Sequence, residues 1–195
     1  KFMLGKRLIN SNSAAAGGPC TTDTLQILGD TSCVAYYKMS DATDESGNYD
    51  GTPTNVNFNV AGKFGPTGEF DGSSSFIDVN AKIPVSLNFS FSFWMNSTDS
   101  TTGQYMFSTK ANSGTNGYWI VFNPDSFMYG EGNNSANGVT QQSPTGNYDD
   151  GNWHHVVVTR ASGGTVNMFI DNNHVITNGS IGANHMTSTA YQNDL

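Results

Sequence analysis

The chain has 195 residues, which suits one domain with a sizeable core, and its 16 acidic and 8 basic side chains give a formal net charge of −8. Charged residues make up only 12% of the chain, whereas glycine, serine, threonine and asparagine are abundant. This composition is typical of short strands joined by many turns and predicts an all-β fold. The negative charge argues against a nucleic-acid partner, and no apolar run approaches the ~20 residues that span a bilayer.

Residues 1–10, KFMLGKRLIN, combine large apolar side chains with three of the eight cations, and a Ser-, Ala- and Gly-rich linker follows them. Residues 1–32 carry a net charge of +1, whereas residues 33–195 carry −9. We therefore expect an N-terminal arm that is either a disordered terminus or an anchor for a larger assembly, separable from a domain at 33–195. The candidate anchor residues are Phe2, Leu4, Lys6, Arg7 and Leu8.

The segment from Cys20 to Gly29 predicts a helix of one or two turns, which Thr22 or Asp23 would cap and Gly29 would end. Cys20 and Cys33 are the only two cysteines of the chain. They close a small loop if they are oxidised, and they are two unpaired thiols otherwise; the sequence leaves both alternatives open.

A first strand is expected at Cys33 to Met39, and a turn rich in carboxylates follows it at residues 44–51. Calcium takes six to eight oxygen ligands, and Asp44, Asn48 and Asp50 with nearby carbonyls supply several. These residues are the candidate ligands of a structural Ca²⁺. The alternative is an ordinary turn whose Asp and Asn side chains accept hydrogen bonds from their own backbone.

Strict alternation marks the next clear strand, in which phenylalanines at 89, 91 and 93 and Met95 face the core and Trp94 faces the other way. Three further strands are expected at Tyr105–Thr109, Tyr118–Asn123 and Phe127–Gly130. Residues 131–151 are polar and rich in glycine, so they predict a long surface loop with a short strand at 138–142. Regular short strands of this kind predict a two-sheet sandwich.

Residues 152–171, NWHHVVVTRASGGTVNMFID, predict a β-hairpin with Gly163 and Gly164 as a two-residue primed turn. In that register Thr159 is opposite Met168 and Val157 is opposite Ile170. The predicted core face then contains alternate residues of both strands, and a slip of one residue would exchange the faces. Its members are Trp153, His155, Val157, Thr159, Val166, Met168 and Ile170.

The hairpin resembles the WHHV and YVDG strands of laminin-G-like, concanavalin A-like jelly-roll domains. The first strand with its acidic loop, the segment EFDGSSSFID at 69–78 and the strand from Phe89 resemble further parts of that family in the same order. The resemblance covers roughly residues 33–176. It implies an antiparallel two-sheet jelly roll, and calcium near the acidic loop is frequent in such domains. It also implies a final strand beside the first one, which residues 177–195 do not show, so we expect either a longer natural chain or a strand from a neighbouring subunit.

Catalysis is not expected. The glucanase motif E-x-D-x-x-E is absent, and the three glutamates, Glu45, Glu69 and Glu131, do not pair with a second acid at the required spacing. The G-x-S-x-G and H-E-x-x-H motifs are also absent. His154 and His155 are adjacent on a strand, so they point to opposite faces and do not share one metal ion.

Carbohydrate binding is the natural alternative to catalysis, because sugars stack on exposed aromatic rings and pair their hydroxyls with amides. The candidate aromatic residues are Trp94, Trp119, Tyr129 and Tyr148. The candidate polar partners are Asn133, Asn134, Gln141 and Gln142. Each aromatic residue has the alternative of being an ordinary core or sheet residue.

The segment CTTDTLQILGD, followed by the strand CVAYYK, resembles structural proteins of tailed phages, particularly those of marine cyanobacteria. This resemblance implies a non-enzymatic component on the exterior of a virion, as a capsid decoration or tail fibre, joined to other virion proteins through the arm. The exposed domain would bind surface glycans, and homo-oligomers are possible. A secreted lectin or adhesin module is the second interpretation, and an enzyme acting on glycans is the third.

Overall fold

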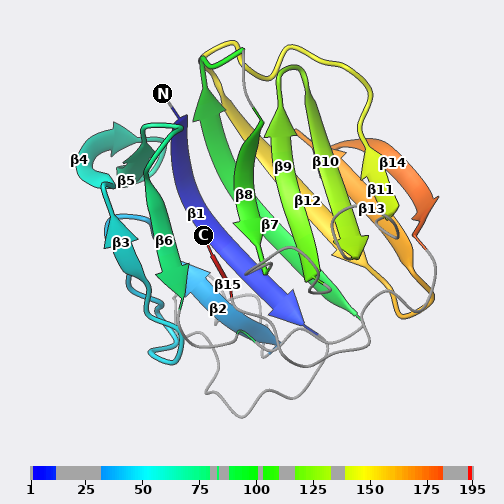
Figure 1. Cartoon of the computed structure of the whole chain (residues 1–195), viewed down its shortest axis with the longest axis horizontal. Coiled ribbons are helices and arrows are strands. Elements are labelled where there is room, and N and C mark those ends of the chain that lie inside the picture. Colours follow the sequence, from blue (N-terminus) through cyan, green and yellow to red (C-terminus); the bar gives the residue numbers. More distant parts are fainter. Residues whose placement is uncertain are drawn as a thin grey trace.

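The computed structural model is a sandwich of two antiparallel sheets (Figure 1). It describes residues 2–11, 32–79, 83, 88–100, 103–109, 117–132, 139–181 and 193–194. Every element in these ranges is a strand, so the all-β jelly-roll prediction is confirmed. The described ranges contain no helix that would span a membrane. The short helix expected between Cys20 and Gly29 lies outside the described residues.

Sheet A has eight strands in the order β14-β13-β12-β7-β1-β5-β4, and β2 pairs with β1 beside this path. Its strands are β1 (Phe2–Ser11), β2 (Cys33–Tyr37), β4 (Asn57–Gly62), β5 (Gly65–Phe70), β7 (Phe89–Ser97), β12 (Trp153–Arg160), β13 (Thr165–Ile170) and β14 (Asn173–Ser180).

Sheet B has seven strands in the order β11-β10-β9-β8-β15-β6-β3. Its strands are β3 (Thr52–Thr54), β6 (Phe76–Val79), β8 (Gln104–Ser108), β9 (Gly117–Asn123), β10 (Ser126–Gly132), β11 (Val139–Gln142) and β15 (Asn193–Asp194). The strands expected near 105, 118, 127 and 138 are all present, with bounds shifted by one or two residues.

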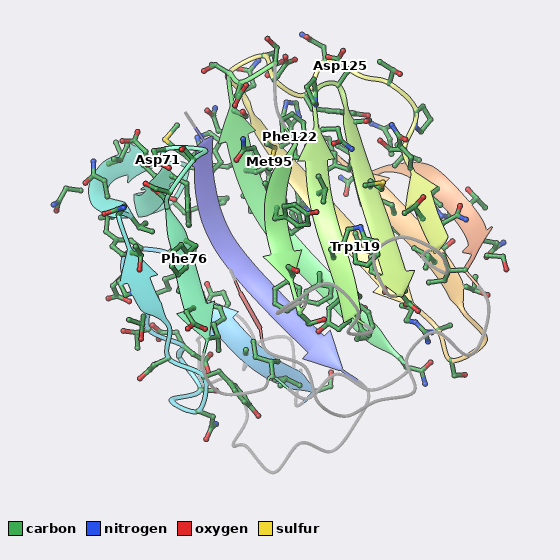
Figure 2. The ribbon with its side chains drawn as sticks, viewed as in Figure 1. Asp71, Phe76, Met95, Trp119, Phe122 and Asp125 are labelled. Carbon is green, nitrogen blue, oxygen red and sulfur yellow. The ribbon has the colours of Figure 1, made fainter. Side chains whose placement is uncertain are left out.

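The core lies between the two sheets and is rich in aromatic rings. On β7, Phe91 and Phe93 are buried as the alternating pattern predicts. Phe91 packs against Phe107 of β8 with ring centroids 4.7 Å apart, and Phe93 packs against Phe127 of β10 at 6.5 Å. Met95 and Phe122, which also belong to this core, are labelled in Figure 2. Burial of these large side chains is the main force that holds the sheets together.

The β12–β13 hairpin departs from the predicted register. Gly164 N–H donates to the Ala161 carbonyl at 2.8 Å, and only Gly164 of the two turn glycines has a positive φ, 78°. The loop is therefore a three-residue loop with a left-handed glycine instead of a two-residue primed turn. Val158 is opposite Met168 as a result. The predicted core face is wrong on β12 and right on β13.

The shift by one residue exchanges the two faces of β12. Its core side chains are His154, Val156, Val158 and Arg160, whereas Trp153, His155, Val157 and Thr159 are half-buried on the outer face. Each residue of β12 lies opposite a residue of β7 that shares its face, so the outer face of sheet A acquires the residues that the sequence assigned to the core.

Residues 2–11, expected as an arm apart from the domain, form strand β1 in the interior of sheet A. β1 pairs with β7 along most of its length and with β5 near its start. It also pairs with β2, as in the pair Leu8 and Tyr36. The candidate anchor residues Phe2, Leu4, Lys6, Arg7 and Leu8 all lie on this strand. The first strand of the expected domain therefore has its neighbour within the same chain.

A buried ion pair joins the two sheets at one end of β12. Arg160 donates from Nε to Glu131 Oε1 at 2.5 Å and from Nη2 to Oε2 at 3.1 Å, and both side chains are fully buried. The Tyr129 hydroxyl donates to the same carboxylate at 2.5 Å. Burial, and then the neighbouring Glu131, raise the pKa of Tyr129 well above its usual range. These contacts satisfy charges that would otherwise be costly to bury.

The loop between β5 and β6 is organised by Asp71 (Figure 2). Its Oδ1 accepts backbone N–H bonds from Ser73, Ser74 and Ser75 at 2.8 to 2.9 Å, and its Oδ2 accepts the Ser74 hydroxyl at 2.6 Å. The Ser74 hydroxyl and these N–H groups hold the pKa of Asp71 well below its usual range. This network explains the serine run that follows the aspartate and glycine.

Cys33 is disulfide-bonded, and the chain has one other cysteine, Cys20. The described residues include no free cysteine. Of the two alternatives that the sequence left open, the structure has the bridged one.

Candidate functional site

The outer face of sheet A carries a line of side chains along β7 and β12. Three cross-strand pairs define it: Trp94 with His155, Ser92 with Val157, and Ser90 with Thr159. All six residues are half-buried, so they form a surface and not a core. At the strand rise of about 3.3 Å per residue, the first and last pairs are roughly 13 Å apart.

An aromatic cluster lies at one end of this line. The Trp94 indole stacks on the His155 imidazole with ring centroids 4.8 Å apart and planes inclined by 21°. The turn between β4 and β5 brings two more side chains to the indole. Phe64 meets it edge-on at 5.5 Å, and Lys63 Nζ lies 4.3 Å from the ring centroid. Phe64 is 54% exposed, so the cluster presents an aromatic surface to solvent.

The position of His155 is fixed by two hydrogen bonds. Its Nε2 lies 2.8 Å from Ser92 Oγ, and its backbone N–H donates to Asp171 Oδ1 at 2.8 Å. Burial lowers the pKa of His155, against a smaller opposing effect of Asp171. The imidazole is therefore neutral at neutral pH, and it serves as a flat polar support for Trp94.

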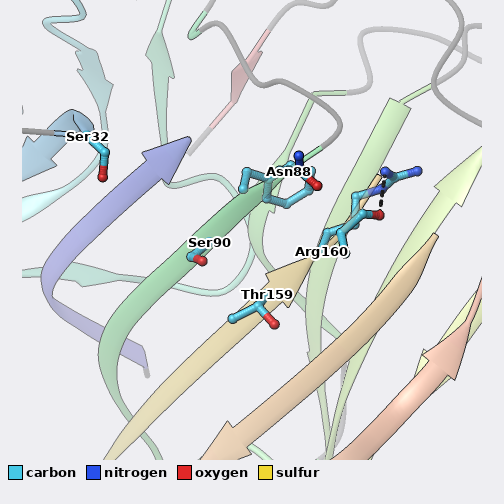
Figure 3. Close-up of a pocket in the computed structure, with 7 residues that line it drawn as sticks. Ser32, Asn88, Ser90, Thr159 and Arg160 are labelled. Atoms are coloured by element: carbon cyan, nitrogen blue, oxygen red, sulfur yellow. Dashed lines mark hydrogen bonds between the residues drawn. The ribbon is translucent and has the colours of Figure 1, made fainter. Parts of the chain in front are cut away.

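A pocket of about 440 Å³ lies at the other end of the line (Figure 3). Figure 3 shows Ser90 and Thr159 side by side on β7 and β12, with Asn88 at the start of β7. The lining residues are Ser32, Asn88, Phe89, Ser90, Thr159, Arg160 and Ala161. Arg160 is held by Glu131, and the other polar side chains that line this end are hydroxyls and an amide.

We call the set Lys63, Phe64, Ser90, Ser92, Trp94, His155 and Thr159 the outer-face site. It combines an exposed phenylalanine ring beside half-buried Trp94 and His155 at one end, hydroxyl groups at the other, and a strand surface between them. Such a surface suits a ligand that has both C–H faces and many hydroxyls.

The other predicted glycan residues do not join this site. Tyr129 is fully buried in the core and is not available to a ligand. Trp119 is only 9% exposed, and its indole covers Gly130, where an added Cβ would lie 2.3 Å from the ring. Tyr148 packs on Phe127 with ring centroids 5.5 Å apart.

The two predicted polar partners that the structure describes, Gln141 and Gln142, also lie outside this site. Gln141 donates to the Ser180 carbonyl at 2.9 Å, and Gln142 donates to the Ser126 hydroxyl at 2.9 Å. Asn133 and Asn134 lie outside the described residues. Among the predicted glycan residues that the structure describes, Trp94 alone belongs to the outer-face site.

Among the candidate calcium ligands, the Asp44 carboxylate already accepts several hydrogen bonds from the protein. Asp44 accepts the backbone N–H groups of Tyr36 at 2.7 Å, Ser46 at 3.2 Å and Tyr49 at 3.2 Å, together with the Ser46 hydroxyl. Asp50 accepts the N–H of Asp44 at 2.8 Å.

Asn48 donates from its side-chain amide to the Ser46 carbonyl at 3.1 Å and to the Ser46 hydroxyl at 3.2 Å. Within the described ranges, no group of three or more His, Cys, Asp or Glu side chains is placed to hold a metal ion. The arrangement does not fit a calcium ion bound through Asp44, and calcium stays a prediction from sequence.

His154 lies on the core side of β12, opposite to His155, as expected for neighbours on a strand. Its ring nitrogens lie 2.7 Å from Asp171 Oδ2 and 3.1 Å from Asp150 Oδ1. Asp171 reaches this position from the β13–β14 turn, where it and Asn172 both have positive φ values, 50° and 67°. His154 thus ties two loops together.

Of the seven members of the outer-face site, sequence reasoning named only Trp94 as a candidate ligand residue. Ser90 and Ser92 alternate with the core residues of β7, on the face of Trp94, but were not named as ligand residues, and Thr159 was assigned to the core. His155 was assigned to the core by the incorrect register. Lys63 and Phe64 approach Trp94 only through the fold of the β4–β5 turn. One local signal was available: in Gly62-Lys63-Phe64-Gly65 a large aromatic residue stands in a tight turn, where no strand face buries it.

A family model described as the concanavalin A-like lectin/glucanases superfamily, Laminin_G_3, matches residues 70–192. No curated protein sequence matches the chain.

Similar solved structures include clostridial toxin binding domains. The binding domain of Paraclostridial Mosquitocidal Protein 1 is 16% identical, with a TM-score of 0.60 over 81% of this chain and 42% of that chain. The binding domain of botulinum neurotoxin DC, in complex with rat synaptotagmin II, is 17% identical, with a TM-score of 0.55 over 97% and 43%. A structure of botulinum neurotoxin type C, whose cell entry depends on two ganglioside molecules, is 17% identical, with a TM-score of 0.53 over 77% and 38%.

The chain therefore spans less than half the length of these toxin domains. At sequence identities of 16% to 17%, the similarity shows that this chain and the toxin domains share a fold.

Proposed function

Because the chain belongs to the Laminin_G_3 family of the concanavalin A-like lectin/glucanases superfamily, we propose that it is a non-enzymatic module that binds glycans on its outer-face site. The single observation that carries this proposal is the exposed Phe64 ring beside the half-buried Trp94 indole, at the head of a hydroxyl-lined strand surface. Aromatic rings stack on the C–H faces of sugars, and hydroxyl groups pair with sugar hydroxyls.

The chemistry of the described carboxylates supports binding without turnover. Glu131 is buried and engaged with Arg160 and Tyr129, and Glu45 pairs with Lys38 at 2.8 Å. Retaining glycoside hydrolysis needs two carboxyl groups about 5 Å apart that flank the substrate. The outer-face site has no Asp or Glu among its members, so it binds a sugar without a group to protonate or attack it.

Two of the similar toxins bind cell-surface molecules: type C depends on gangliosides, and the DC domain was solved with synaptotagmin II. These facts belong to the toxins. They support recognition of surface molecules as a use of this fold, and the exposed Phe64 ring beside Trp94 in the outer-face site favours the glycan class over a protein receptor here.

Trp94→Ala and Phe64→Ala test the proposal on a glycan array followed by titration of the best ligand. Phe64 is in an exposed turn, so its loss should leave the fold intact. Each change should weaken binding about tenfold, since the loss of one stacked ring costs on the order of 1.4 kcal/mol. Tyr105→Ala is the matched control, because Tyr105 is 64% exposed on sheet B. Absence of binding to any glycan, or unchanged affinity in both variants, overturns the proposal.

We further propose that the module is carried on the exterior of a phage virion, joined there to other virion proteins. This proposal rests on the sequence resemblance of residues 20–38 to tailed-phage structural proteins. A secreted, extracellular lectin is the alternative location. Proteomics of purified particles distinguishes them: many copies per particle support the virion, and recovery only from the particle-free medium supports secretion.

A further inference from the structure

Lys63 differs from the other basic side chains that the structure describes. Lys38 pairs with Glu45 at 2.8 Å, and Arg160 pairs with Glu131 at 2.5 Å. Among the described residues, Lys63 has no carboxylate partner. Its contacts are two aromatic rings, with Nζ 4.3 Å from the Trp94 centroid and 5.8 Å from the Phe64 centroid.

The contact with Trp94 holds the ammonium group in place without neutralising it. An aromatic face attracts a cation through its quadrupole, but it carries no net charge. The ammonium group has three N–H donors, and the Lys63 side chain is exposed, so donors remain for a ligand. Because the ring already restricts the lysine, an anionic ligand loses less side-chain entropy when it binds there.

The local charge around Lys63 also favours an anion, although the whole chain carries −8. The cross-strand pairs of the outer-face site contain no Asp or Glu. Asp171, the acid next to His155, is occupied by the His155 N–H and by His154 Nδ1. The Lys63 ammonium group, 4.3 Å from the Trp94 centroid, is therefore placed to favour an anion at this end of the site.

We propose that the outer-face site selects acidic glycans, with the sugar ring against exposed Phe64 beside Trp94 and its carboxylate or sulfate on Lys63. Ser92 and the hydroxyl-lined end at Ser90 and Thr159 then receive the neutral remainder of the oligosaccharide. This inference rests on the proposed glycan binding and adds the chemical class of the ligand. The anion has two common sources, a sugar acid and a sulfate ester.

The experiment uses the full chain and three matched glycans with the same backbone: a neutral one, one ending in a carboxylated sugar, and one bearing a sulfate ester. Wild type should bind one or both acidic glycans about fivefold to tenfold more tightly than the neutral glycan, as expected for one partly exposed charged contact. The two acidic ligands show which anion fits. Lys63→Gln should abolish the preference while the neutral glycan still binds, and Lys63→Arg should retain it.

Lys38→Gln is the matched control, because it removes an exposed lysine of equal charge away from the site. It should leave the preference unchanged. If wild type binds neutral and acidic glycans with equal affinity, the inference about acidic glycans is overturned. If Trp94→Ala then loses this glycan binding, the proposed function still stands. The inference is also overturned if the Lys63→Gln variant still prefers acidic glycans. The same holds if this variant loses binding to all three glycans equally. Absence of glycan binding by wild type overturns the proposed function itself.

Discussion

The imidazole of His155 stacks on the indole of Trp94, with ring centroids 4.8 Å apart, and both side chains lie on the outer face of sheet A. The stack exists because the two residues are a cross-strand pair of β7 and β12. Ser92 Oγ, 2.8 Å from His155 Nε2, fixes the orientation of the ring. The position of the proposed binding surface thus depends on the register of one hairpin.

The first prediction concerns the pH dependence of this stack. Burial lowers the pKa of His155 below the ordinary value of about 6.5. In the unfolded chain the imidazole therefore takes up a proton at a higher pH than in the folded chain. His155 contributes stability above pH of about 6.5, and this contribution is lost as pH falls through the folded pKa. The melting temperature of wild type should fall more between pH 7.5 and 5 than that of His155→Gln, and NMR titration of the ring should show the lowered pKa. Equal pH dependence of both proteins would contradict it.

The second prediction tests the hairpin loop. Gly164 has a φ of 78°, which costs a residue with a Cβ about 1 kcal/mol or more. Gly164→Ala should lower the free energy of unfolding by that amount in urea titrations. Gly163→Ala is the control: no atom lies within 4 Å of its added Cβ, and its φ is not in the left-handed region. Equal losses in the two variants would favour a two-residue turn with both glycines left-handed.

The hairpin also shows how far the sequence determines the fold. Several strands follow from the alternation of apolar residues, as on β7, where Phe91 and Phe93 face the core. Strand β1 does not, because the sequence assigned its residues to an arm. The face of β12 does not follow, because both of its faces carry a histidine and valine, and the loop glycines allow two turn types. The positions of Lys63 and Phe64 depend on the β4–β5 turn, a tertiary feature that local patterning does not contain.

The third prediction concerns the buried pair of Glu131 and Arg160. Glu131→Gln or Arg160→Met alone leaves a buried charge without its partner and should cost about 3–5 kcal/mol of unfolding free energy. The combination of Glu131→Leu, Arg160→Met and Tyr129→Phe removes both charges and the hydroxyl that depends on them, so it should cost less than either single change. Urea unfolding measures all three. If the combined variant instead loses as much unfolding free energy as the single changes together, the two charges do not depend on each other.

The fourth prediction concerns the acidic loop. Asp44→Ala removes the acceptor of three backbone N–H groups and should destabilise the domain by about 3 kcal/mol. Asp41→Ala is the control, since exposed Asp41 accepts only the Thr43 N–H. Melting curves with and without a chelator then test calcium. A loss of similar size under both conditions supports a loop held by hydrogen bonds, whereas a melting temperature that falls on chelation in wild type and not in Asp44→Ala supports a calcium site.

The last prediction separates a strand from an arm at the N-terminal end. β1 lies between β7 and β5 in sheet A and also pairs with β2. Without it, the backbone donors and acceptors of β7 and β2 that face β1 would lose their partners, and the sheet would be split between β7 and β5. A variant that lacks residues 1–11 should therefore lose cooperative unfolding or melt far below wild type.

A synthetic peptide of residues 2–11, added in excess, should restore much of the lost stability, because strand pairing needs no covalent link. A scrambled peptide of the same composition is the control, since it keeps the charge and hydrophobicity and loses the register. If the shortened chain melts like wild type, residues 2–11 are not part of the folded sheet, and their candidate role as an anchor for a larger assembly becomes the better explanation of their apolar and basic side chains.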